Sequence, residues 1–268
     1  MTTLAEYAGS RELMVNLTLR ELRTKYKRSV LGWTWSLLNP LATMVILSLV
    51  FGVFLKIRPP TGSPSGLNNF PLFLLCGLLP WTFLINGTNG SISSLVGNAN
   101  LIKKSYFPRE LLVASQVLAW LISFAIEMLV LTVVLLAVGN LALPYLPAVV
   151  LIMFALAVFV TGLGLALSAA NVYFRDVEHF VAILFQVWFY LTPILYPISQ
   201  VPERPGVLRD LYGLNPMVVF VEALRDCLYD LRFPSVIRLG SLLLISGVTF
   251  LAGLAIFAKL EARLAEEL

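Results

Sequence analysis

The sequence predicts an all-α polytopic membrane protein with six transmembrane helices, and two observations support that prediction. Of the 268 residues, 59% are hydrophobic and only 13% are charged, about half the charge of an ordinary soluble domain. The charges also cluster, leaving long runs without Asp, Glu, Lys or Arg at 29–55, 59–102, 128–174, 180–202 and 239–258. This composition excludes a disordered tail, a disulfide scaffold and a typical cytosolic enzyme.

The expected spans follow from the lengths of those runs. A membrane-spanning helix needs about 20 mostly apolar residues, so each of the two longest runs is too long for one span. We place the spans at 33–55, 70–95, 111–137, 147–171, 180–198 and 237–258. Proline and glycine mark 59–66 as a loop, and 139–147 is a second short connection. We therefore expect a cytoplasmic N-terminal interfacial helix in residues 1–32 and a single membrane domain in residues 33–268.

The distribution of Lys and Arg predicts the orientation. With six spans, twelve basic residues fall on the side that carries the N-terminus and seven on the other side. Cytoplasmic loops carry an excess of basic residues. We therefore expect both termini to be cytoplasmic. The first 28 residues mix basic and acidic side chains and lack the apolar core of a signal peptide.

The N-terminal segment is expected to form an amphipathic helix at the membrane surface. Val15, Leu19, Leu22 and Tyr26 fall on one narrow stripe. Polar and charged residues lie to one side of it: Glu12, Asn16, Arg20, Arg23 and Lys27. The alternative is a solvated charged leader that only enforces topology.

The sequence predicts no catalytic, cofactor-binding or metal-binding residues. It contains no G-x-x-x-x-G-K-[ST], H-E-x-x-H, C-x-x-C or G-x-S-x-G pattern. Cys76 and Cys227 suggest neither a disulfide framework nor a metal site. The single histidine, His179, is interpreted as part of a solvated turn. Glu127 falls inside the third span, where we favour a structural hydrogen bond over an ion relay because no basic partner accompanies it.

Five segments are polar or aromatic in ways that lipid alone does not require. They are Lys25–Pro40, Asn100–Glu110, Asn171–His179, Trp188–Pro197 and Gly213–Met217. In this order they resemble the permease subunits of type-2 ABC exporters for bacterial surface polysaccharides, a group that includes exporters of O-antigen, capsule, teichoic acid and galactan. The resemblance runs from about residue 20 to residue 220.

The resemblance implies a subunit that moves lipid-linked polysaccharide across the bacterial plasma (inner) membrane. It implies a homodimer of this chain with two cytoplasmic ATPase subunits, which would bind the ATP and Mg²⁺. Residues 100–109 look like the coupling helix that docks into the ATPase, with Arg175 and Asp176 as a second contact. The coupling residues are Asn100, Leu101, Lys103, Lys104, Tyr106, Phe107, Pro108 and Arg109. The alternative for residues 100–109 is a positive-inside loop that only touches lipid headgroups, and the charges of Arg175 and Asp176 are equally well explained as caps of two helix ends.

Aromatic side chains suit a sugar channel because the C–H faces of pyranose rings pack on flat aromatic faces. The candidates lie in the first and fifth spans and are Phe51, Phe185, Trp188, Phe189, Tyr190 and Tyr196. Aromatic residues also populate membrane interfaces, which is the interpretation we prefer for Trp33 and Trp35.

The outer segment after the fifth span is expected to contain a short helix that starts at Asn215 and Pro216, a capping residue and a pre-organised first position. An apolar stripe follows: Met217, Phe220, Val221, Leu224 and Leu228. Glu222, Arg225 and Asp226 are opposite, so the helix should lie at or dip into the outer leaflet. The resemblance implies that Asn215, Pro216, Met217 and Phe220 gate the outer mouth, whereas interfacial anchoring is the alternative.

Two other functions remain open on the sequence alone. The same fold could export a drug or a lipid. An integral membrane transferase acting on polyprenyl-linked sugars would need paired acids or a His–Asp pair, for which Asp176, Glu178 and His179 form the only cluster. A neighbouring gene for an ATPase favours export over the transferase.

Overall fold

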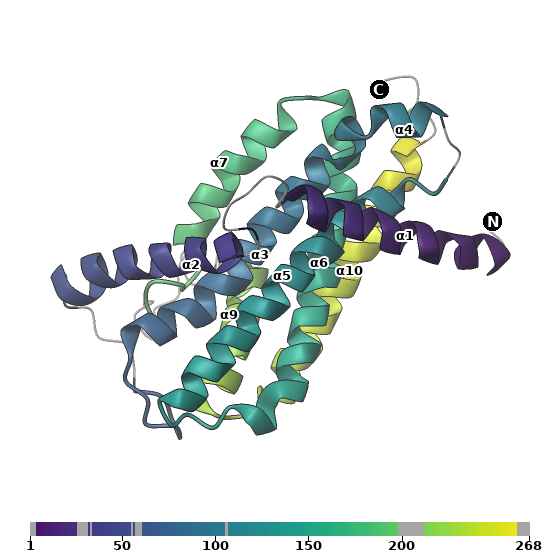
Figure 1. The fold of residues 1–268 in the computed structure, drawn as a ribbon. Coiled ribbons are helices and arrows are strands. Elements are labelled where there is room, and N and C mark those ends of the chain that lie inside the picture. Colours follow the sequence, from purple (N-terminus) through teal and green to yellow (C-terminus); the bar gives the residue numbers. More distant parts are fainter. Residues whose placement is uncertain are drawn as a thin grey trace.

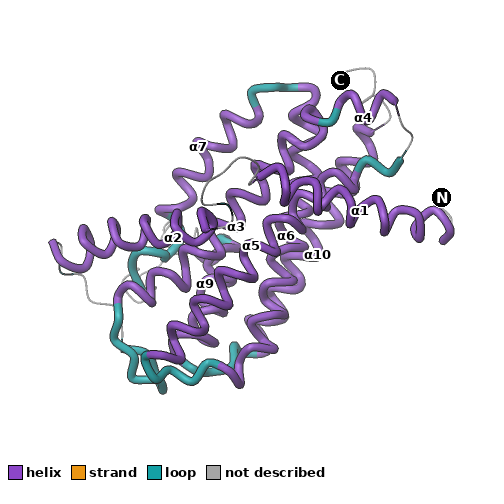
Figure 2. Tube along the Cα trace, viewed as in Figure 1, coloured by secondary structure: helices purple, strands orange, loops and turns teal. Residues whose placement is uncertain are grey.

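The computed structural model describes residues 4–25, 32, 34–54, 56, 61–104, 107–197 and 212–261. Within these residues the chain is helical with connecting loops and contains no strand (Figure 2). The predicted all-α fold is confirmed for this part of the chain. The elements are α1 (Leu4–Lys25), α2 (Thr34–Leu47), the π-helix η1 (Ser48–Phe54), α3 (Phe70–Gly97), α4 (Ala99–Lys104), α5 (Glu110–Ala137), the 3₁₀-helix η2 (Leu143–Tyr145), α6 (Leu146–Tyr173), α7 (Val177–Tyr190), α9 (Pro216–Arg225), the π-helix η4 (Asp226–Asp230) and α10 (Val236–Glu261).

Local sequence explains where several of these helices begin and end. Asn69 caps α3, because its side-chain oxygen accepts a hydrogen bond from the Leu72 N–H at 3.2 Å. After α5, Gly139 adopts a φ of +87°, a conformation that glycine enters without steric cost. α7 stops shortly before Pro193, which has no N–H to continue the helix.

The long helices form a bundle in which α3 and α6 are the most buried (Figure 1). α3 packs against both α5 and α6, and α10 packs along α6. α2 extends from the side of this bundle, and its side chains together with those of η1 are mostly exposed. The short helix α9 is enclosed between α3, α6 and α10.

The connections gather at the two ends of the bundle. At one end, the Tyr173 hydroxyl donates to the Leu260 carbonyl at 2.9 Å, and Arg109 donates to the Glu261 carbonyl at 2.8 Å. This end therefore joins the α3–α5 and α6–α7 connections to the end of α10. At the opposite end, Asn140 donates to the Leu228 carbonyl at 2.6 Å, joining the α5–α6 connection to η4. The segments expected on one side of the membrane are thus on one side of the bundle.

The predicted spans agree with the helices to within three residues, except for the fifth. Among the described residues, five helices are long and apolar enough to cross a membrane. The expected fifth span, 180–198, is instead the 14-residue helix α7, which ends at Tyr190. An irregular segment follows from Leu191 to Pro197, because two prolines interrupt the helix there. The described residues therefore contain five single helices of span length, rather than the six that were predicted.

The apolar stripe predicted for the N-terminal helix is divided between two environments. Val15 and Leu19 are 48% and 43% exposed, whereas Leu22 is buried together with Leu17, which was not part of the predicted stripe. Tyr26, the last member of the stripe, lies outside the described residues. α1 packs on α5, so one stripe meets protein and a second apolar stripe remains uncovered. The sequence pattern does not distinguish the face of α1 that contacts α5 from the face that remains exposed, because both are apolar.

Glu127 lies on α5 and is 6% exposed. Its position facing protein rather than lipid agrees with the expectation from sequence. A carboxyl group at this depth is costly when it faces hydrocarbon, so burial within the protein is the favourable arrangement.

α6 and α10 approach each other at two glycines. A Cβ added at Gly162 would lie 2.6 Å from the Phe250 Cα, and one added at Gly253 would lie 2.7 Å from the Gly162 carbonyl carbon. Neither contact leaves room for a methyl group. Small residues allow close backbone approach between membrane helices, which is why this crossing holds α10 against the core.

We expect Gly253→Ala to destabilise the purified subunit by about 1–3 kcal/mol or more, because the added methyl group must separate α6 from α10. The measurement is thermal unfolding in detergent. Gly247→Ala is the matched control, since no atom beyond its chain neighbours and its own helix backbone lies within 4 Å of its added Cβ. Equal melting temperatures for the two variants would contradict the close crossing.

Candidate functional site

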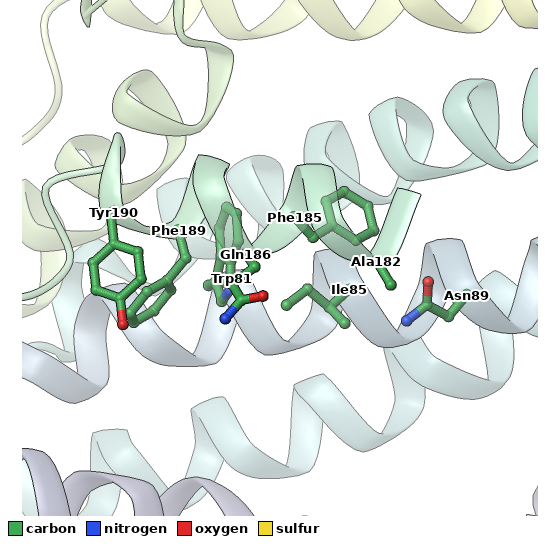
Figure 3. A pocket seen from close by; sticks show the side chains of 8 residues that line it. All are labelled: Trp81, Ile85, Asn89, Ala182, Phe185, Gln186, Phe189 and Tyr190. Carbon is green, nitrogen blue, oxygen red and sulfur yellow. The ribbon is translucent and has the colours of Figure 1, made fainter. Parts of the chain in front are cut away.

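A pocket lies between α3 and α7, near the point where α7 ends (Figure 3). Its volume is about 290 Å³, close to the lower end of the range for small-molecule sites. α3 contributes Trp81, Ile85 and Asn89, which recur every four residues and so share one helix face. α7 contributes the remaining lining residues: Ala182, Phe185, Gln186, Phe189 and Tyr190.

Aromatic rings form one wall of this pocket. The Trp81 ring lies 6.3 Å from that of Phe185, 5.9 Å from that of Trp188 and 5.6 Å from that of Phe189. Phe185 and Trp188 are stacked, with centroids 5.9 Å apart and an interplanar angle of 29°. Such offset and edge-on contacts stabilise each ring in a fixed orientation. The array therefore presents rigid aromatic surface.

Two amide side chains add polar groups to the pocket. In Figure 3, Gln186 lies among the aromatic side chains, whereas Asn89 lies at the other end of the pocket, next to Ala182. The Asn89 Oδ1 atom is buried and has no hydrogen-bond partner among the described residues. A buried acceptor without a partner is unusual and suits a site that takes up a donor from a ligand. Flat apolar faces combined with a few amides fit a hydroxylated ring such as a sugar.

The structure brings most, but not all, of the predicted channel aromatics together. Phe185, Phe189 and Tyr190 line the pocket, and Trp188 is in their array. Phe51 is elsewhere, on η1, where it packs against the main core. The Tyr196 hydroxyl is bonded to the Tyr190 carbonyl at 2.9 Å and to the Tyr212 hydroxyl, so it braces the segment after α7.

Trp81 and the two amides were missed by the sequence analysis. Trp81 falls within an apolar span, where it is indistinguishable from a residue that faces lipid or core. The available signal was the spacing of Trp81 and Asn89, which puts an aromatic and an amide on one helix face two turns apart. Nothing in the sequence indicates that α7 packs against that face.

The helix expected after the fifth span is present as α9, and its start agrees with the prediction. The Asn215 side-chain oxygen accepts a hydrogen bond from the Met217 N–H at 3.0 Å, and Pro216 occupies the first turn. Met217 and Phe220 are fully buried. Asn215 is also buried, at 7% exposure. The four residues proposed for the outer gate are thus part of a packed element.

The position predicted for the charged residues Arg225, at the end of α9, and Asp226, at the start of η4, is wrong, because they are 3% and 2% exposed. We expected them opposite the apolar stripe, at the surface of the outer leaflet. Asp226 instead forms ion pairs with Arg232, at 2.5 Å, and with Arg238. The apolar stripe and the charges are both enclosed because α3, α6 and α10 surround the helix.

Arg225 connects α9 to the segment that follows α7. Its guanidinium donates to the Pro193 carbonyl at 2.5 Å and to the Ile194 carbonyl at 2.9 Å. It also forms an ion pair with Glu222 at 3.0 Å and lies 3.7 Å from the centre of the Phe73 ring. A planar group with five donors is suited to hold several acceptors at once. Arg225 therefore satisfies backbone carbonyls that the break in the helix leaves open.

The segment of residues 100–109 predicted for coupling contains both anchored and exposed side chains. Ile102 of α4 is buried and Phe107 is half-buried, and both pack in a cluster with Leu112 of α5. Lys103 and Lys104 are exposed. The other members are Asn100, which is exposed, and Leu101, Pro108 and Arg109, which are half-buried; Tyr106 lies outside the described residues.

Two neighbouring features complete this end of the bundle. Arg109 donates to the Glu261 carbonyl at 2.8 Å, a bond within the chain. Arg175 and Asp176 are exposed at the start of α7, as are Glu178 and His179. No group of three or more His, Cys, Asp or Glu residues that could hold a metal ion is found in the described part of the chain.

Comparison with known proteins identifies the family. Residues 12–229 match the family described as ABC-2 type transporter, and the chain belongs to this family. It is 33% identical over 269 residues to the O-antigen export system permease protein RfbA of Myxococcus xanthus, covering 99% of this chain and 97% of that protein.

Two further relatives agree. A protein of the same name from Klebsiella pneumoniae is 31% identical, covering 95% of this chain and 94% of that protein. The polysialic acid transport protein KpsM of Escherichia coli is 26% identical, covering 91% and 92%. The resemblance carried by the five sequence motifs is confirmed. The chain is a multi-pass integral membrane permease, from a family of transporters rather than enzymes.

We expect Arg225→Ala to lower the stability of the purified subunit by about 3 kcal/mol or more, because Glu222 and two carbonyls lose their buried partner. The stability of Arg225→Lys should lie between those of Arg225→Ala and the wild type, since one ammonium group cannot make all the hydrogen bonds of the planar guanidinium. Thermal unfolding in detergent is the measurement. Arg175→Ala, at an exposed arginine, serves as the control, and a melting temperature for Arg225→Ala as high as the control's would refute this role.

Proposed function

We propose that the chain is the channel-forming subunit of an ATP-driven exporter that moves lipid-linked polysaccharide from the cytoplasm across the bacterial plasma membrane. The observation that carries the substrate class is the pocket between α3 and α7, where aromatic faces and amides converge. Full-length similarity to permeases named for O-antigen and polysialic acid supports the same class. A drug or lipid exporter remains the second candidate, because an apolar aromatic surface accepts many ligands.

ATP hydrolysis is assigned to a separate subunit. The sequence lacks the glycine-rich loop and lysine that cradle nucleotide phosphates, and membership of the ABC-2 family supports an ATPase partner. This chain would hold no cofactor, and ATP and Mg²⁺ would bind to the partner. A transferase would use Asp176, Glu178 and His179, which are exposed at the start of α7 and give such an enzyme little enclosure.

The ATPase is proposed to dock at α4 and the residues that follow it. Buried Ile102 and half-buried Phe107 fix the element to the bundle, which leaves Lys103 and Lys104 exposed for an acidic partner surface. Arg20 of α1 donates to the Asn98 side chain at 2.7 Å, at the junction of α3 and α4, and so supports the same element. Arg175 and Asp176 supply a second contact. In this arrangement α1 is an interfacial helix, and both termini are cytoplasmic.

A second copy of the chain is proposed to complete the channel. α2 and η1 form an apolar helix that the rest of the subunit covers poorly, and several side chains of α7 are exposed, among them Tyr190 at 62%. Pairing of these helices between two copies would enclose the pocket face. α7 and α9 would then share the fifth crossing, with α9 and η4 near the outer mouth, where η4 meets the α5–α6 connection.

Cells that lack this chain should accumulate lipid-linked polysaccharide on the cytoplasmic side and lose polysaccharide from the surface. The wild-type chain should restore both. A chain carrying Lys103→Glu and Lys104→Glu should fail to restore them and should not co-purify with the ATPase, because like charges facing an acidic surface repel. Reversal at Lys103 and Lys104 is preferred to truncation of Phe107, whose packing within the subunit would confound the result.

Lys259→Glu is the matched control, because this exposed lysine lies at the same end of the bundle on α10. It should restore export. Normal surface polysaccharide in cells that lack the chain would reject polysaccharide as the substrate. If the doubly reversed variant still binds the ATPase fully, the docking site is not at α4.

A further inference from the structure

The side chain of Asn215 makes more hydrogen bonds than capping requires. Its Oδ1 atom accepts from the Met217 N–H at 3.0 Å and from the Trp188 indole N–H at 2.7 Å. Its Nδ2 atom donates to the Leu191 carbonyl at 2.9 Å and to the Thr192 hydroxyl at 3.1 Å. An N-cap needs only the bond to the helix backbone. The other three bonds all lead to the end of α7.

The bond to Trp188 fixes the orientation of a ring in the aromatic array. An indole has a single polar group, its N–H, so one strong acceptor determines how the ring is turned. The Trp188 ring lies edge-on to Trp81, with centroids 5.9 Å apart, and is stacked with Phe185. Both of these partners line the pocket between α3 and α7. Asn215 is therefore linked to the pocket wall through one intervening side chain, that of Trp188.

We propose that Asn215 is a positioning residue that holds the Trp188 ring, and through it the aromatic wall of the pocket, in a fixed relation to the first turn of α9. A displacement of α9 must then either turn the Trp188 ring or break the bond to Asn215. The consequence for export depends on the function proposed above, whereas the positioning itself does not.

The alternative is that Asn215 serves only as a helix cap, and one substitution separates the two roles. Serine is as good a capping residue as asparagine, but its short side chain cannot reach Trp188 as well as Met217. Asn215→Ser therefore keeps the cap but removes the bond to Trp188, together with the two Nδ2 bonds to Leu191 and Thr192. Because the cap is kept, the subunit should fold. Trp188→Phe keeps a ring in the array and removes the N–H.

The spectroscopic test uses the full subunit purified with its ATPase. The Trp188 contribution to the fluorescence emission is the difference between the spectra of the parent protein and its Trp188→Phe variant. We expect this difference spectrum to change position when Asn215 is replaced by Ser, because the indole loses its acceptor. Identical difference spectra with Asn215 and with Ser at this position would overturn the proposal.

The export test is a double-mutant cycle that measures polysaccharide at the cell surface. Asn215→Ser and Trp188→Phe should each reduce export about fivefold. Both remove the Asn215–Trp188 bond, and Asn215→Ser also removes the bonds to Leu191 and Thr192, so the double variant should export no less than Asn215→Ser alone. Asn140→Ala is the matched control, since Asn140 is a second buried asparagine, bonded to the Leu228 carbonyl at 2.6 Å and not to Trp188. The fold-reductions in export caused by Asn140→Ala and by Trp188→Phe should multiply in the double variant.

The outcomes separate this inference from the proposed function. Normal export by Asn215→Ser, in cells where export requires the chain, would overturn the link between positioning and transport. If surface polysaccharide does not depend on the chain at all, the proposed function fails, and the spectral result alone decides whether Asn215 positions Trp188.

Discussion

The arrangement of the subunit depends on satisfying backbone polar groups where the helical path is broken directly after α7, in residues 191–197. Backbone groups at membrane depth find no water, so irregular segments there must be bonded within the protein. Arg225 donates to the carbonyls of Pro193 and Ile194, and Asn215 donates to that of Leu191. Two side chains from the two ends of α9 thus hold the broken segment. These bonds satisfy the carbonyls that follow the end of α7, which lines the pocket.

The end of the bundle that carries α4 is fastened by a separate set of bonds. Arg20 joins α1 to Asn98, Arg109 bonds the last carbonyl of α10, and Tyr173 bonds the carbonyl before it. α1, α4, α6 and α10 therefore meet around one group of side chains. The close glycine crossing of α6 and α10 continues this connection along the bundle. The proposed docking of an ATPase at α4 would therefore act on elements that are connected to one another.

Much of the fold could be predicted from the sequence, because charge-free runs of span length leave few alternatives. The cap at Asn215 was likewise predictable, since it depends only on local geometry. Burial of Arg225 was not, because a helix with three charges is typical of a surface element until its neighbours are known. The pocket was half predictable: the aromatics of α7 stand out, whereas Trp81 lies in a span where any large apolar residue is expected. The partners of each helix face depend on tertiary packing, which no periodicity encodes.

The central claim is that sugar passes along the pocket between α3 and α7, and protection of Gln186 tests it most directly. Gln186 is exposed and lines the pocket, so a cysteine in its place, in a chain lacking Cys76 and Cys227, can be labelled by a small thiol reagent. Labelling should be several-fold slower in cells that synthesise the lipid-linked polysaccharide than in cells that do not, because the polymer occupies the pocket during export. Equal labelling rates in the two kinds of cell would contradict the account.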